Sequence, residues 1–408
     1  MNNVCEVVEL SGHIIDSHIL PNVLDKIILM GGDFEIEKLE VGKTNEDISY
    51  AKLIVKGKDH KHLDGILREI QQMGAIVSTK DAKTEKALDD CVLPDNFYGT
   101  TNLPTYVKID GVWKEVEDIE MDCVIVIENR DGEKVPVCKR MGLVKKGDDV
   151  VVGYGGIRVI PLERTREKDI FGFMQSEVSP EKPLDYYSKT IAKEMKKIKE
   201  KGGNIVWVVG TAIAHTRAHK ILEELVREGY VDALFCGNGF ATMDIEYALF
   251  KTTLGMDDEC NVVKGGYKSH LVAINEMWKV GGIKKAVEKG ILTKGVLYEC
   301  VKNNIPYVIG GSLRDDGPLP DTIRDVIVAQ DEMRRYAKKA DMCVILATML
   351  HGIATGNILP ARVKTVCIDM NPYVVTRLQD RGTHQALGIV SDPCAFLHLL
   401  KKDLDNLS

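Results

Sequence analysis

The residues that decide the fold run from 205 to 239 and read IVWVVGTAIAHTRAHKILEELVREGYVDALFCGNG. The apolar run Ile205–Val209 ends at a glycine, and residues 215–227 then carry helical spacing. A second apolar run, Ala233–Cys236, leads into Gly-Asn-Gly. An apolar strand, a glycine-rich loop and a helix, in this order, form the repeating unit of a parallel sheet with crossover helices.

Four further apolar runs repeat this pattern toward the C-terminus, and most of them lead through a polar or glycine-rich loop into a helix. They are Pro306–Ile309, Met342–Ala347, Val363–Ile368 and Ala386–Val390. Six such runs predict a Rossmann-like, doubly wound parallel sheet over residues 181–408, so the fold class is α/β. Ligands of these sheets bind outside the carboxyl ends of the strands, and we therefore expect the loops after these runs to form the site.

Two smaller domains are predicted before this sheet. Residues 1–82 alternate as a ferredoxin-like βαββαβ module. Residues 83–180 contain short β-like runs broken by Asp-Gly at 110–111 and 131–132, which indicates hairpins in a small, mostly β domain. The expected elements of the first module are the strands 4–10, 34–41, 50–55 and 75–77 and the helices 20–30 and 63–73.

Composition narrows the class of protein. A length of 408 residues indicates two or three domains, and a net charge of −7 argues against a nucleic-acid partner. No run of about 18 apolar residues is present, and the first ten residues lack the features of a signal peptide. Ten cysteines without a C-x-x-C pair indicate reduced thiols and no metal site. We expect a cytoplasmic protein with no membrane partner.

The loop Gly237-Asn238-Gly239 is the best candidate for a phosphate cradle. Glycines allow close backbone approach, and the helix that follows offers free N–H groups. Thr242 stands where G-x-G-x-x-G would have its third glycine, so a plain strand-to-helix turn is the alternative. For the loop 210–212 we favour the plain turn.

Two aspartates follow the last strands. Asp369 ends an apolar run, where an acidic side chain often accepts hydrogen bonds from ribose hydroxyls. Its alternative role is a helix N-cap, although Asn371 suits that role better. Asp392 precedes Pro393 at the start of the last helix, and an N-cap is its expected role.

The loop 310–317 combines glycines with charged side chains. Arg314 is a candidate to bind a carboxylate in a bidentate manner. Asp315 or Asp316 is a candidate to receive an amine or to move a proton. The alternative for the whole segment is a solvated loop.

Two further segments complete the set of candidates. Residues 348–352 read TMLHG and offer apolar side chains to line a ring, together with His351, for which a structural role is the alternative. Asp244 follows the Gly-Asn-Gly loop and is a catalytic candidate if it faces the cleft; a surface carboxylate is the alternative.

The sequence resembles a known family over essentially its whole length. FCGNGFATMDIEYALFKTTLGMD (235–257), GGSLRDDGPLPDT (310–322), ATMLHGIATGNILP (347–360) and DMNPYVVTRLQDRGT (369–383) look like the archaeal proteins with a LOR/SDH region, named for lysine-oxoglutarate reductase/saccharopine dehydrogenase. That family includes archaeal-type ornithine cyclodeaminases and the C-terminal part of cyanobacterial arginine dihydrolase/ornithine cyclodeaminases. The resemblance implies an NAD-binding fold related to deoxyhypusine synthase.

The resemblance also implies a reaction and a set of contacts. L-Ornithine would become L-proline and ammonia by hydride abstraction from Cα, ring closure by the δ-amine and hydride return. Arg314, Asp315 and Asp244 are catalytic candidates from group chemistry and not from the family. The resemblance assigns NAD contacts to Asn238, Gly239, Asp316, Thr348, Met349, Leu350, His351, Asp369, Asp392 and Pro393.

Two other functions stay open at this stage. One is a net NAD(P)-dependent amino-acid oxidoreductase of the saccharopine-dehydrogenase type, which would consume free cofactor. The other is a non-catalytic regulatory protein that senses NAD or an amino acid, because the βαββαβ start is typical of amino-acid-sensing modules. By analogy of fold, we expect a homo-oligomer.

Overall fold

The computed structural model describes residues 4–43, 47–77, 80–161, 184–259, 261–315, 317–380 and 385–407. The chain forms two compact units, residues 1–173 and 174–408, and each is described by itself. The first unit contains the first predicted domain and most of the second, so the boundaries at residues 82 and 180 stay predictions. Among the described residues, no helix is long and apolar enough to cross a membrane.

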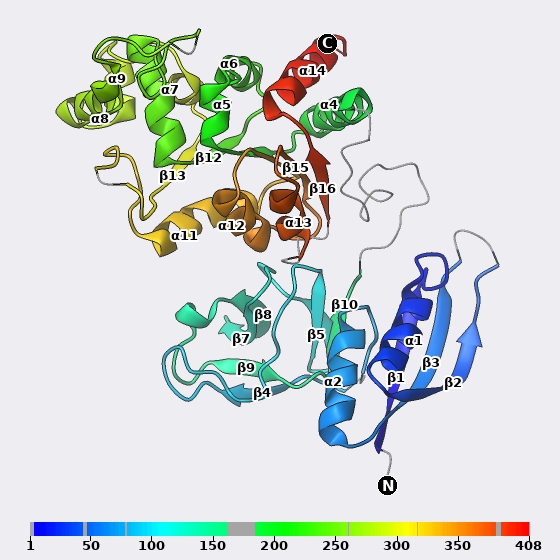
Figure 1. The fold of residues 1–408 in the computed structure, drawn as a ribbon. Helices are drawn as coiled ribbons and strands as arrows, with labels where there is room; N and C mark the ends of the chain where they lie inside the picture. Colours follow the sequence, from blue (N-terminus) through cyan, green and yellow to red (C-terminus); the bar gives the residue numbers. More distant parts are fainter. Residues whose placement is uncertain are drawn as a thin grey trace. The chain divides into compact units, whose positions relative to one another are not determined.

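The first module has the strand order of a ferredoxin-like unit. Its antiparallel strands lie in the order β1-β3-β2, and both helices pack against them through buried aliphatic side chains (Figure 1). The last predicted strand, 75–77, is reduced to one bridge between Ile76 and Glu9. The elements are β1 (Val4–Gly12), α1 (Ile19–Leu29), β2 (Asp33–Glu40), β3 (Ser49–Gly57) and α2 (His60–Gln71).

Two antiparallel sheets follow, in the orders β4-β9-β7-β8 and β10-β5-β6. The predicted hairpins are confirmed: Asp110, Gly111, Asp131 and Gly132 all have positive φ, as a two-residue type I′ turn requires. The strands are β4 (Lys83–Lys86), β5 (Thr105–Ile109), β6 (Val112–Glu115), β7 (Val124–Arg130), β8 (Glu133–Lys139), β9 (Asp149–Val152) and β10 (Ile157–Val159), and a 3₁₀ turn spans Met141–Leu143.

The second unit contains a six-stranded sheet, and all five strand pairs in it are parallel. Its order is β13-β12-β11-β14-β15-β16, which by position along the chain is 3-2-1-4-5-6. That order is the one found in dinucleotide-binding Rossmann domains. The strands are β11 (Ile205–Val209), β12 (Ala233–Gly237), β13 (Tyr307–Gly310), β14 (Met342–Leu346), β15 (Lys364–Asp369) and β16 (Ala386–Val390).

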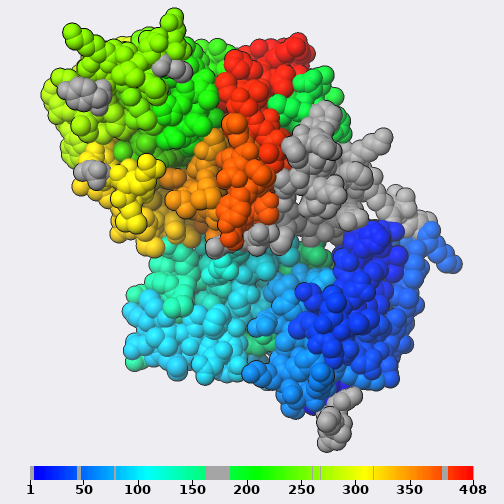
Figure 2. Space-filling view, viewed as in Figure 1, coloured from blue at the N-terminus to red at the C-terminus, as the bar shows by residue number. Residues whose placement is uncertain are grey.

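Helices cover both faces of this sheet, as the doubly wound prediction requires. Helices α11, α12 and α13 lie on one side, and α4, α6 and α14 lie on the other (Figure 1). Figure 2 shows α14 (red) beside α4 (green) at the surface, and Ser188 of α4 donates a 2.6 Å hydrogen bond to Asp403 of α14. The helices are α4 (Leu184–Glu200), α5 (Thr211–His215), α6 (His219–Arg227), α7 (Asn238–Phe250), α8 (Ser269–Val280), α9 (Ile283–Glu288), α10 (Val296–Lys302), α11 (Val326–Ala337), α12 (Leu350–Ile358), α13 (Pro372–Asp380) and α14 (Pro393–Asp405).

The single helix predicted over residues 215–227 is wrong, because the chain breaks it at Arg217. That residue has a φ of 65°, which ends α5 before α6 begins. Its guanidinium donates to Asp258 (2.6 Å) and to Thr253 (2.8 Å) in the loop after α7. Contacts with residues far along the chain thus hold a backbone conformation that local helical spacing does not predict.

The ends of β11 and β14 approach each other closely at Gly210. Its N–H donates to the carbonyl of Leu346 at 2.9 Å. A Cβ atom at position 210 would lie 1.8 Å from the carbonyl oxygen of Ala347. Only glycine fits this approach without moving backbone.

Replacing Gly210 with alanine is expected to lower the free energy of unfolding by about 3 kcal/mol, because the added methyl group must push two central strands apart. Urea denaturation measures this change. Gly317→Ala is the matched control, because a Cβ there meets nothing within 4 Å. Equal stability of the two variants would contradict the close approach.

Candidate functional site

The strand register brings the predicted site segments to one edge of the sheet. Val209 pairs with Leu346, Gly237 with Gly310, and Asp369 with Val390, so all six strands end at the same side. The segments around residues 238, 315, 351, 369 and 392 each follow one of these strand ends. The sheet therefore collects at its carboxyl edge the loops that the sequence selected.

The strand order reverses between β11 and β14, which is the position where ligands of such sheets bind. Gly210 and Ala347 flank that crevice, and Ala347 has a φ of 51°, which is uncommon outside glycine. Sequence reasoning ranked the loop 210–212 below the Gly-Asn-Gly loop. A Cβ at Gly239 would lie 3.1 Å from Thr211, so the two loops are neighbours.

Asn238 is buried and joins the start of α7 to the loop after β13. Its Oδ1 accepts from Leu319 N–H and from the Thr322 hydroxyl, each at 3.0 Å. Its Nδ2 donates to Asp315 Oδ1 at 3.4 Å. Asp315 Oδ2 also accepts from Ser312 N–H at 2.7 Å. Asn238 thus positions Asp315, and direct contact of Asn238 with NAD stays a prediction.

His351 lies in the first turn of α12, against the ends of β12 and β13. A Cβ at Gly237 would lie 3.0 Å from its ring, and a Cβ at Gly310 would lie 3.1 Å from its Nε2. Burial lowers the pKa of His351, and the charge of Asp315 opposes that shift. The imidazole is therefore mostly neutral at neutral pH. Sequence reasoning selected His351 but missed the two glycines that make room for it.

The remaining candidates in the segments after β13 and β14 differ in exposure. Met349 and Leu350 are 42% and 72% exposed, so their apolar side chains are available to a flat ring. Thr348 is half-buried beside them. Arg314 is exposed. Asp316 lies outside the described residues.

The two aspartates after the last strands take different roles. Asp369 is half-buried and accepts from Asn371 N–H at 2.8 Å; burial raises the pKa of its carboxyl group. Asn371 accepts from Tyr373 N–H at 3.0 Å and so takes the capping role, as expected. The N-cap predicted for Asp392 is confirmed by its 2.9 Å bond from Cys394 N–H, with Pro393 in the first turn.

Asp244 is not a surface carboxylate, and that alternative is wrong. Its side chain is 1% exposed, because α7 is buried on most sides. Its two oxygens accept from the N–H groups of Val296 and Leu297, each at 3.0 Å, at the start of α10. Burial raises its pKa to about 6. The geometry favours a capping role, and the catalytic role stays a prediction.

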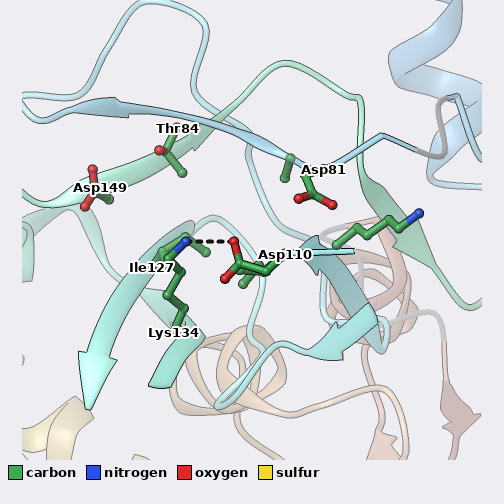
Figure 3. Close-up of a pocket in the computed structure, with 9 residues that line it drawn as sticks. Asp81, Thr84, Asp110, Ile127, Lys134 and Asp149 are labelled. Atoms are coloured by element: carbon green, nitrogen blue, oxygen red, sulfur yellow. Dashed lines mark hydrogen bonds and ion pairs between the residues drawn. The ribbon is translucent and has the colours of Figure 1, made fainter. Parts of the chain in front are cut away.

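One described pocket, of about 270 Å³, lies in the first unit between the sheets β4-β9-β7-β8 and β10-β5-β6 (Figure 3). Its charged groups largely pair with one another or with neighbours: Lys134 donates to Asp110 at 2.9 Å, and Asp149 pairs with Lys86 at 2.7 Å. None of the predicted site residues lines it. The candidate site is therefore the carboxyl edge of the parallel sheet.

The strand order and the loops at this edge define a dinucleotide-binding Rossmann domain. Residues 189–400 match a family model described as arginine dihydrolase ArgZ-like, C-terminal, Rossmann fold. Residues 104–188 match the first region of the same C-terminal part. Residues 5–103 match the LOR/SDH bifunctional enzyme conserved region.

Similar proteins agree with these models. The ornithine cyclodeaminase of Methanopyrus kandleri is 55% identical over 98% of this chain and 97% of its own length. The apo structure of ArgZ, an arginine dihydrolase of cyanobacteria, is 36% identical, covers 100% of this chain and 59% of its own, and superposes with a TM-score of 0.86. The chain belongs to the family defined by the LOR/SDH conserved region and the ArgZ-like C-terminal Rossmann fold. The archaeal members of this family are named ornithine cyclodeaminases.

A second similar structure contains ligands. The ternary complex of AgrE with ornithine and NAD⁺ is 39% identical, covers 100% of this chain and 58% of its own, and has a TM-score of 0.54. A putative deoxyhypusine synthase of Entamoeba histolytica reaches a TM-score of 0.34, which is too low to carry an argument.

The burial of Asp244 predicts a pH dependence of stability. Its folded pKa of about 6 exceeds the ordinary 3.8, so the folded state binds more protons than the unfolded state between these values. The stability that Asp244 contributes to the folded state is complete below the ordinary pKa and is lost as the pH rises through about 6. Relative to Asp244→Asn, we expect the wild type to lose roughly 3 kcal/mol of unfolding free energy over that window.

Urea denaturation at several pH values measures this difference. Asp185→Asn, at an exposed position of α4, is the control and should show no such change. A constant difference between wild type and Asp244→Asn across the window would contradict the assignment. Lost turnover with an unchanged stability profile would instead favour a catalytic Asp244.

Proposed function

We propose that this chain is an NAD-dependent ornithine cyclodeaminase, an ammonia-lyase that converts L-ornithine to L-proline and ammonia. The observation that carries the proposal is the 3-2-1-4-5-6 sheet, whose carboxyl edge gathers the predicted loops. Support comes from the archaeal relatives, which match over nearly their whole length, and from AgrE, which is described with ornithine and NAD⁺.

The residues at the edge fit a dinucleotide. Gly237 precedes α7 with extended backbone and without a side-chain cap, so the first amides of that helix are available to an anion. Asp369 offers carboxylate oxygens at the end of β15 for ribose hydroxyls. When bound, NAD supplies reversible hydride transfer, which makes the overall reaction redox-neutral.

The chain's own residues would orient the substrate and exclude water. The exposed Arg314 suits the ornithine carboxylate, and the half-buried Asp315 suits an ammonium group. Met349 and Leu350 suit the apolar face of a flat ring. Asp316 and the other family-implied contacts remain part of the proposal.

Proline biosynthesis, a cytoplasmic location and a homo-oligomeric state also belong to this proposal. The nine cysteines in the described part of the chain are free thiols, as a reducing compartment allows. Val326, Ile327 and Val328 are three successive apolar residues at the start of α11, and each is about half exposed, which supports burial in an assembly.

Purified protein incubated with NAD⁺ and L-ornithine is expected to form proline and ammonia in equal amounts. No NADH should accumulate, because the hydride returns to the product. Mass spectrometry of the products and absorbance at the NADH band measure both. Accumulation of NADH would instead indicate a saccharopine-type oxidoreductase. NAD binding without turnover would favour the sensing protein.

Replacing Asp369 with asparagine is expected to weaken NAD binding roughly 10-fold to 100-fold, because a charged acceptor for ribose is lost. Isothermal titration calorimetry measures the affinity. Asp341→Asn is the matched control: Asp341 also accepts a backbone N–H, that of Asn204 at 2.8 Å, but at the opposite edge of the sheet. Similar affinities of both variants would argue against the ribose role.

A further inference from the structure

His351 has a setting that a purely structural histidine does not need. Gly237 and Gly310, the last residues of two neighbouring strands, leave the space that its ring occupies, since a Cβ at either would lie within 3.1 Å of it. Its backbone carbonyl accepts from the Thr355 hydroxyl at 2.7 Å, which fixes the first turn of α12. The ring thus stands at the carboxyl edge, where the substrate is expected.

The charges around the ring are few. Asp315, from the loop after β13, is the described group whose charge acts on His351. The two strand ends against the ring are glycines, and α12 carries no other titratable side chain. Asp315 is itself held by Ser312 N–H and by Asn238. A neutral imidazole on which a fixed carboxylate acts electrostatically is a suitable proton acceptor near neutral pH.

We propose that His351 is a catalytic residue that carries the proton between the two nitrogens of the diamino acid, an inference that rests on the proposed function. The lone pair of a ring nitrogen takes a proton from the δ-ammonium group, which leaves a free amine and an imidazolium. The amine then attacks the imine carbon, which forms the ring C–N bond, leaves the α-nitrogen as an amine and places the positive charge on the ring nitrogen. The imidazolium gives its proton to the α-nitrogen, and the imidazole then takes the extra proton of the ring nitrogen as the C–N bond to ammonia breaks. The ring nitrogen takes this proton back once the ring is reduced, so the histidine ends neutral and no net proton or electron is consumed.

His351→Gln tests this role, because glutamine keeps a polar end but does not titrate. Three measurements apply: the pKa of the imidazole in the NAD-free protein by NMR, the affinity for NAD, and the pH profile of kcat/KM. The exposed His398 of α14 gives the control variant, His398→Gln, which should match the wild type in all three. If His351→Gln does not fold, His351→Asn provides the same test.

The wild-type imidazole is expected to titrate below its ordinary 6.5, and kcat/KM should fall at the same pH. At saturating NAD, His351→Gln should form proline about 10²–10⁴-fold more slowly and lose this acid limb, whatever its affinity for NAD. An acid limb that persists in the variant would overturn the proposal in favour of another base. A weakened NAD affinity with full turnover at saturating NAD would reduce His351 to a cofactor contact. Absence of proline from the wild type would instead overturn the proposed function itself.

Discussion

The close contact between the ends of β11 and β14 is the constraint on which the site depends. The Gly210 N–H to Leu346 carbonyl bond continues the parallel ladder one residue beyond β11, at the last residue of β14. This ladder sets where the strand order reverses and where the crevice opens. Every other site segment is positioned by its register relative to this pair, because β12 pairs with β11 and β15 pairs with β14.

Buried polar side chains also connect loops to helices through hydrogen bonds. Asn238 holds the loop after β13 through Leu319 and Thr322, and Asp244 holds the start of α10. Each side chain satisfies backbone N–H groups that would otherwise be buried without a partner, and such groups are costly to leave unpaired. These hydrogen bonds therefore fix Leu319, Thr322 and the start of α10 relative to α7.

The sequence predicted the six strands and their loops because apolar periodicity and glycine position are local signals. It also predicted the Asp392 cap, which needs only the neighbouring Pro393. Strand order, the break at Arg217 and the glycines around His351 depend on contacts between residues tens to more than a hundred positions apart. No local pattern encodes such contacts. For the same reason, the sequence pattern favours a plain turn for the loop 210–212 and does not reveal its place at the crevice.

Asp244 and Asp315 illustrate why residue type alone does not identify a catalytic carboxylate. Both are aspartates that follow neighbouring strands, β12 and β13, yet Asp244 is 1% exposed with both oxygens bound to the start of α10. Asp315 is half-buried, its partners fix its direction, and its charge acts on His351. A carboxylate whose lone pairs already serve backbone amides has little capacity left for a substrate ammonium. Accessibility and hydrogen-bond satisfaction, and not the raised pKa of Asp244, therefore decide between them.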